Sequence, residues 1–345
     1  MKKVLAIILS VGLMSAVVTA FVGCQDNMQI SGDFSTAATD EEVYALIETV
    51  TENENKWFGE PKTDDFSYGM KLSAKSEIET SVSISDGASY FQGSESYFSK
   101  ELELDIEYVY NNYFGQWTPC FANEASGKAR ISTRDSVSYK EGQTTFLSKT
   151  VLDGDIYTEQ AASSMPTVFL DGKMESVSDD QTLEETGKYV VRGNAEYYFI
   201  DFINSVSLTR SLSYLLDIDE GVTVYIDDAG DETKVKISCD AGAFYEYYVN
   251  YKYFISIAGG EDSKDAAVEK MDFQMFDVYI SFKTETGLLT GYGTMTEAEL
   301  SELTVQDNWT SAINRYAFKV SENIWYKKSD GSVAAPADLD AYQWL

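Results

Sequence analysis

Alternation of apolar and polar residues dominates the chain and predicts antiparallel strands. In residues 101–110, apolar side chains occupy the even positions and acidic side chains the odd positions up to 107. The same two-residue period recurs in residues 78–84, 245–257 and 276–282. Because alternate side chains of a strand point to opposite faces, each stretch predicts a strand with one buried and one solvated face.

Turn-forming residues separate these stretches and predict consecutive hairpins. They occur at Asp86-Gly87, Glu141-Gly142, Asp153-Gly154, Asp171-Gly172 and in the sequence from Asp228 to Asp231. The last of these joins the predicted strands 222–226 and 234–238.

Three segments predict helices instead. Thr39 stands three residues before Glu42, the spacing of a capping box, and an apolar stripe follows at helical spacing in Val43, Leu46, Ile47 and Val50. This predicts a helix over residues 39–55. A second helical region, either one bent helix or two short ones, is predicted over 194–216, and a further capping-box pattern at 296–299 predicts a short helix near the end.

The composition suits one folded body. With 345 residues, 44% of them hydrophobic, the chain can build a sizeable core, and no Pro-rich or Gly-rich linker divides it. We therefore expect residues 40–345 to form a single domain of the α+β class, made mainly of antiparallel strands.

The first 24 residues have the features of an exported lipoprotein. Lys2 and Lys3 precede an uncharged run, residues 4–22, which ends at Gly23-Cys24. This resembles a bacterial lipobox, and the resemblance implies that residues 1–23 are a signal peptide and that Cys24 carries a diacylglycerol with palmitate-type chains. The alternative is an uncleaved anchor, since 19 uncharged residues can just span a bilayer. The polar residues that follow predict a flexible tether over 24–39.

Charge and residue usage exclude several functions. The formal charge is −31, and loss of residues 1–23 would leave 24 basic residues against 57 acidic ones, a charge of −33. Such a body repels nucleic acid, and its membrane contact must come from the lipid anchor. The sequence has no histidine, which excludes His-dependent catalysis and imidazole-bound metals. We expect no metal and no cofactor.

The other candidate chemistry stays open. Cys120 and Cys239 either pair or lie buried as free thiols. The acidic residues between 217 and 232 could hold calcium, although solvated turns explain them better. Nothing marks a carboxylate pair for hydrolysis, so we expect no enzyme. Aromatic residues crowd 244–254, where they either fill a core or contact a ligand such as a sugar.

The order of elements behind a lipobox resembles the LolA/LppX-like lipoproteins, with local echoes in residues 150–157 (TVLDGDIY) and 284–289 (TETGLL). The resemblance implies a large curved antiparallel sheet, an open half-barrel, with helices packed on its concave side. In several members a cavity there holds acyl chains. The function expected is a lipid-anchored protein on the outer side of a bacterial cell membrane that binds an apolar or amphipathic, lipid-like ligand. A structural or protein-interaction lipoprotein without a cavity is the alternative, and a carbohydrate-binding or carbohydrate-active protein is a distant third.

Overall fold

The structure is a computed structural model. It describes residues 28–57, 66–85, 91–113, 116–140, 143–159, 167–178, 181–191, 215, 218, 220–247, 261–287, 289–306, 313–329 and 333–345.

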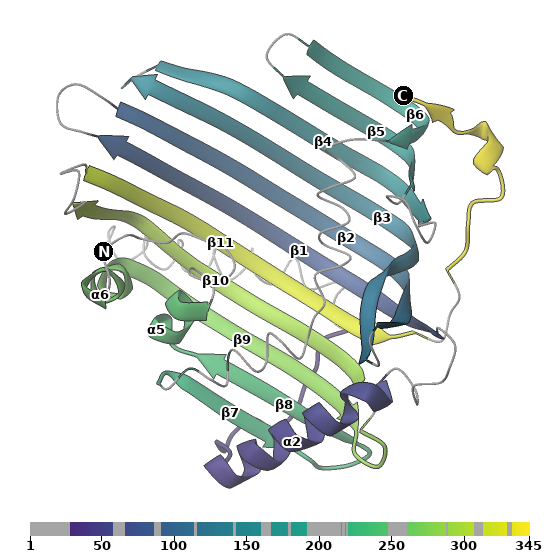
Figure 1. The fold of residues 1–345 in the computed structure, drawn as a ribbon, viewed down its shortest axis with the longest axis vertical. Coiled ribbons are helices and arrows are strands. Elements are labelled where there is room, and N and C mark those ends of the chain that lie inside the picture. The colour runs from purple at the N-terminus through teal and green to yellow at the C-terminus, as the bar shows by residue number, and fades with distance from the viewer. Residues whose placement is uncertain are drawn as a thin grey trace, which may run out of the picture.

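One open sheet of twelve strands dominates the fold (Figure 1). The strands are β1 Phe66–Ser85, β2 Phe91–Tyr113, β3 Gln116–Lys140, β4 Gln143–Glu159, β5 Thr167–Ser178, β6 Gln181–Val191, β7 Val222–Asp227, β8 Glu232–Cys239, β9 Met271–Lys283, β10 Leu289–Gln306, β11 Ile313–Lys328 and β12 Gln343–Trp344. Their order across the sheet is β12-β6-β5-β4-β3-β2-β1-β11-β10-β9-β8-β7. All neighbours are antiparallel except β12, which pairs parallel with β6. The mainly antiparallel class is therefore confirmed.

Within the described ranges, few helices accompany the sheet. They are α2 Asp40–Trp57, α5 Ala241–Phe244, α6 Glu261–Lys270 and the 3₁₀ turn η2 Leu339–Ala341. The predicted capping box of α2 is confirmed: Thr39 N donates to Glu42 Oε2 over 2.7 Å, and Glu42 N donates to Thr39 Oγ1 over 3.4 Å. These two bonds satisfy backbone groups that the first turn of a helix leaves free.

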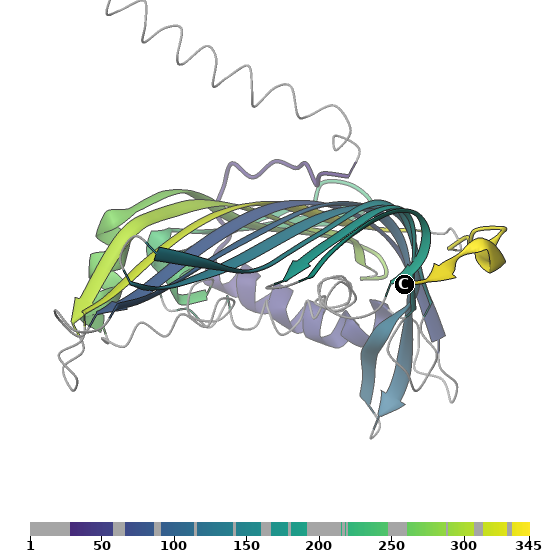
Figure 2. The ribbon, with the colours of Figure 1, turned by 90° about the horizontal axis from the view of Figure 1, so that it is seen from above.

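Two of the predicted turns lie inside strands instead, and that prediction was wrong. Gly154 in β4 is paired directly with Gly172 in β5. A Cβ atom on Gly154 would lie 2.4 Å from the Asp171 carbonyl oxygen, so no side chain fits there. These glycines allow two backbones to approach closely in a sheet that curves, as Figure 2 shows, rather than reversing the chain.

Two further predictions of local structure were wrong. Residues 296–299 lie in β10, where pairing with β9 and β11 on both sides prevails over the capping-box pattern. The strand predicted from residue 245 begins in a helical turn that continues α5 to residue 247. Asp240 caps α5 by accepting a hydrogen bond from Ala243 N over 2.9 Å. Residues 248–257, and all of the predicted helix 194–216 except Leu215, lie outside the described residues.

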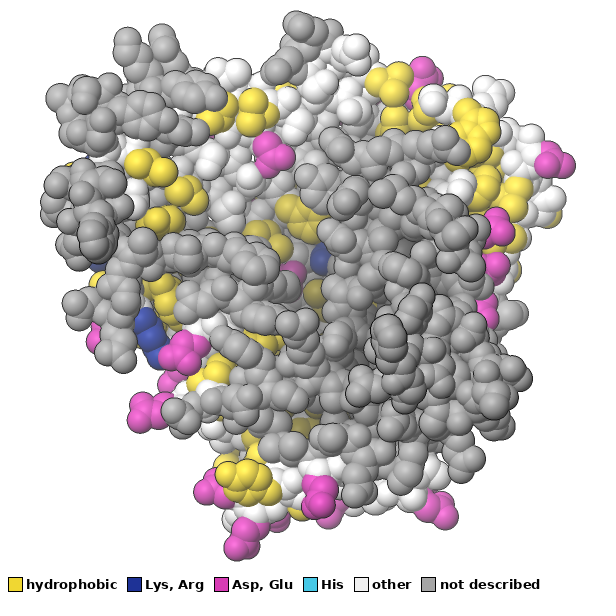
Figure 3. Space-filling view, in the orientation of Figure 1, with side chains coloured by type: hydrophobic (Ala, Val, Ile, Leu, Met, Phe, Trp, Pro, Cys, Tyr) yellow, Lys and Arg dark blue, Asp and Glu magenta, His cyan; other side chains and the backbone are white. Residues whose placement is uncertain are grey.

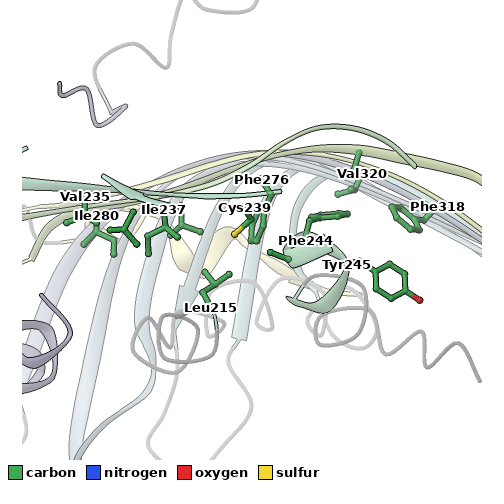
Figure 4. Close-up of a cluster of buried hydrophobic side chains, with 14 of the residues drawn as sticks. Leu215, Val235, Ile237, Cys239, Phe244, Tyr245, Phe276, Ile280, Phe318 and Val320 are labelled. Atoms are coloured by element: carbon green, nitrogen blue, oxygen red, sulfur yellow. The ribbon is translucent and has the colours of Figure 1, made fainter. Parts of the chain in front are cut away.

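The sheet has one face that carries the buried apolar side chains, here called the buried face, and an opposite charged face. Two clusters of apolar side chains cover the buried face. The first joins strands β7–β11 to Leu46 of α2, Leu215 and Phe244 of α5, and Figure 4 shows Leu215 and Phe244 on the same side of the sheet as Ile237 and Ile280. The second lies on β1–β6 and the adjoining part of β11.

Candidate functional site

A row of four polar residues crosses the buried face between the two apolar clusters. Lys100 on β2 pairs with Ser76 on β1, Ser76 pairs with Glu322 on β11, and Glu322 pairs with Thr296 on β10. All four are buried, with exposed fractions of 7%, 0%, 4% and 2% in that order. We call these residues the polar row.

Apolar residues flank the polar row on both sides along β1, β2 and β11. On β11, Ile324 belongs to the second apolar cluster and Val320 to the first, and Glu322 lies between them. On β1, Ala74 and Ile78 stand on the two sides of Ser76 in the same way. The two-residue period of the strands therefore places the polar row on the same face of the sheet as the apolar side chains around it.

Hydrogen bonding and charge link three members of the row, Ser76, Glu322 and Lys100. Ser76 Oγ donates to Glu322 Oε1 over 2.9 Å. Burial raises the pKa of Glu322, while the charge of Lys100 and the bond from Ser76 act to lower it. Burial lowers the pKa of Lys100 from 10.5 to about 8, and the charge of Glu322 opposes this change. Removal from water disfavours each charge, and the two opposite charges partly compensate each other.

Thr296 completes the row with an unused hydrogen-bonding group. Its Oγ1 atom is buried and has no hydrogen-bond partner among the residues that the structure describes. Leaving a buried hydroxyl without a partner costs about 1–3 kcal/mol, so such groups in folded proteins call for an explanation. A hydroxyl of this kind can accept or donate a hydrogen bond to a bound molecule.

Figure 3 views the molecule from the side on which α2 lies. Hydrophobic atoms, with charged atoms of both signs among them, are visible in a hollowed central part of this surface, beside residues that the structure does not describe.

The charged face offers a different kind of surface. A shallow groove of about 460 Å³ crosses strands β10, β11, β1, β2 and β3, and its lining includes Glu299, Lys319, Glu79 and Arg134. A smaller one of about 230 Å³ lies over β2, β3 and β4 among acidic and basic side chains. Charged linings of this kind do not suit an apolar guest.

The candidate residues from the sequence are distributed as follows. Cys24 lies outside the described residues. Cys239 is a buried free thiol, and burial together with Asp277 and Asp240 raises its pKa to about 12. The side chain of Cys120 is not among those described.

The acidic segment 217–232 contains a structural carboxylate. Asp227 accepts hydrogen bonds from Asp33 N and Ala229 N, which lower its pKa. Across the described part of the chain, no three Cys, Asp or Glu residues gather as metal ligands would. The described helices include none with the length and apolar character needed to cross a bilayer.

The polar row was missed in the sequence, although a signal for it exists. Lys100 stands two residues before Leu102 and two after Phe98, in phase with the apolar positions of β2. Glu322 is likewise in phase with Val320 and Ile324 on β11. A charge at an apolar position of an alternating strand predicts a buried polar site, but only the pairing of the strands shows that these charges share one row.

Comparisons with known proteins place the chain in no family. No protein family and no curated protein matches the sequence. Among solved structures, a TodX monoaromatic hydrocarbon channel mutant is 7% identical with a TM-score of 0.16, over 76% of this chain and 90% of that one. The translocator domain of the autotransporter NalP from Neisseria meningitidis is 6% identical with a TM-score of 0.13, over 84% of this chain and 95% of that one.

Proposed function

We propose that this chain is a lipoprotein, anchored outside the cytoplasm through Cys24, that binds one amphipathic, lipid-like molecule without acting on it as an enzyme. In this proposal the helices lie on the concave side of the sheet, and the ligand lies between them and the buried face. The observation that supports it best is the polar row of Lys100, Ser76, Glu322 and Thr296 between two apolar clusters. Binding sites for small apolar molecules combine a hydrocarbon lining with a few placed polar groups in this manner.

The charges of the polar row favour a ligand whose polar head group is uncharged. Lys100 and Glu322 compensate each other, so an anionic head attracted by Lys100 would be repelled by Glu322. A hydroxyl or amide head group carries no charge whose hydration is lost on burial. It can pair with Thr296 Oγ1, which has no hydrogen-bond partner in the described part of the chain. We therefore propose a ligand of the monoacylglycerol or fatty-alcohol type rather than a free fatty acid.

Thr296→Val tests this role because it removes the hydroxyl and keeps the shape of the side chain. Isothermal titration of the protein without its signal peptide should show monoacylglycerol binding weakened about tenfold by the substitution, which corresponds to about 1.4 kcal/mol. Binding of a hydrophobic dye without a hydrogen-bonding head should not change. Thr133→Val is the matched control, since Thr133 is a buried threonine on β3 outside the polar row.

Two results would contradict the proposal. Unchanged monoacylglycerol affinity in Thr296→Val would mean that the row does not receive the head group. A folded wild-type protein that binds neither the monoacylglycerol nor the dye would favour the alternative, a structural or protein-interaction lipoprotein with no ligand.

A further inference from the structure

Residues 28–38, here called the N-terminal strap, lie against the sheet within the segment predicted as a tether. Asp33 N donates to Asp227 Oδ2 over 2.9 Å, and Lys234 Nζ donates to the Ser31 carbonyl oxygen over 2.6 Å. Farther along, Ala38 N donates to the Val224 carbonyl oxygen over 2.8 Å. These contacts fix the strap to β7 and β8 at the edge of the sheet.

An aromatic contact places the strap at Phe34 on the charged face. The ring of Phe34 meets Tyr279 edge to face, with centroids 6.0 Å apart. Tyr279 neighbours Ile280 on β9, and since Ile280 points into the buried face, Tyr279 points to the other. Leu46 of α2 packs in a cluster of the buried face. Figure 2 shows the strap and α2 on opposite sides of the sheet, and the contacts of Ala37 and Ala38 with β7 place the crossing between them at this edge.

The strap and Asp227 fit each other closely. A Cβ atom on Gly32 would lie 2.8 Å from Asp227 Oδ2 and 3.0 Å from the Phe34 ring, so a larger residue could not take this position without displacement. Hydrogen bonds from Asp33 and Ala229 also lower the pKa of Asp227, which keeps it ionised as an acceptor near neutral pH.

We propose that the strap turns the charged face of the sheet toward the membrane and the buried face away from it. This inference rests on the proposed lipid anchor at Cys24. Met28, the first residue of the strap, follows Cys24 by four residues, and a chain of that length spans at most about 14 Å. A tether free as far as Thr39 would have fifteen residues and a reach of about 50 Å. The docked strap thus holds the charged face of the sheet close to the bilayer. Ligand exchange then takes place at the buried face, on the opposite side of the sheet.

Energy transfer to a membrane dye tests this orientation in the full lipidated protein. The protein is reconstituted into phosphatidylcholine vesicles that carry an acceptor dye in the headgroup region, and a donor is attached at one of two engineered cysteines in a Cys120→Ser background. Thr223→Cys lies on β7 at an exposed position beside the strap, and Tyr44→Cys lies on α2, where Tyr44 is 71% exposed. We expect stronger transfer from position 223 than from position 44.

Variants that undock the strap complete the test. Asp227→Ala removes the acceptor for Asp33 N, and the larger side chain of Gly32→Val keeps the strap from approaching Asp227. Each variant should abolish the difference in energy transfer between the two labelled positions, while the protein still binds vesicles. Asp228→Ala, the adjacent acid of the same turn, is the control and should keep the difference. Equal transfer from both positions in lipidated wild-type protein would overturn the orientation. Absence of a diacylglycerol mass on Cys24, with loss of vesicle binding, would instead overturn the anchor itself.

Discussion

Ser76 and Glu322 face each other as a directly paired couple of β1 and β11, and the serine hydroxyl donates to the buried carboxylate over 2.9 Å. The pairing of strands far apart in sequence creates this contact, and the same registers bring in Lys100 and Thr296. The polar row is thus a property of the sheet itself.

Removal of one charge from the row should destabilise the protein more than removal of both. Glu322→Leu leaves Lys100 buried without its compensating charge and should lower the free energy of unfolding by about 3–5 kcal/mol. Lys100→Met combined with Glu322→Leu should recover most of this loss, because apolar residues replace both charges. Urea unfolding of the two single variants and the double variant measures the coupling. Additive losses would show that the two charges do not interact.

The stability contributed by Lys100 should rise with pH above about 8. Burial lowers the pKa of Lys100 to about 8 in the folded protein, against 10.5 in the unfolded chain. Below pH 8 the lysine is protonated in both states and the cost of burying its charge is fully present. Between pH 8 and 10.5 folding releases a proton, so the free energy of unfolding increases relative to that of Lys100→Met. Denaturant titrations of both proteins across this range measure the difference, and parallel pH profiles would refute the expectation.

Cys239 should resist alkylation in the folded protein. Burial raises its pKa to about 12, so almost no thiolate exists at pH 8, and the sulfur is also shielded from reagent. Iodoacetamide followed by peptide mass spectrometry should show an unmodified Cys239 under native conditions and a modified one in urea. A peptide linking Cys239 to Cys120 without reductant would show that the thiol pairs.

Gly154→Ala should destabilise the sheet where β4 and β5 approach closely. The new methyl group would lie 2.4 Å from the Asp171 carbonyl oxygen. Backbone must move to relieve this overlap, at a cost of about 1–3 kcal/mol. Gly242→Ala is a suitable control, since the nearest atom to its Cβ is a side-chain oxygen at 3.3 Å. Equal thermal melting of the two variants would contradict this account.

The sequence predicts the parts of this fold that depend on local pattern. Alternation correctly indicates β2 and β9, and the Thr39 capping box correctly indicates the start of α2. Where pairing with strands that are distant in the sequence decides the structure, the local pattern predicts the wrong element. Thr296 belongs to a capping-box pattern but lies between two strands, and Gly172 belongs to a turn pattern but serves a close approach of backbones.

The candidate site is nonlocal for the same reason. Lys100 and Glu322 can be recognised singly as charges at apolar positions, yet they are 222 residues apart in the chain and meet only through the intervening β1. Single-sequence periodicity reports which face a side chain takes but not which strand lies beside it.

Native mass spectrometry tests the central claim, amphiphile binding at the buried face, most directly. The protein without its signal peptide should be purified from cells without detergent and compared with Thr296→Val under identical conditions. We predict a wild-type species whose mass exceeds that of the chain by one uncharged amphiphile, recovered by organic extraction and depleted in Thr296→Val. A folded wild-type protein at its bare chain mass that also fails to take up added monoacylglycerol would contradict the account.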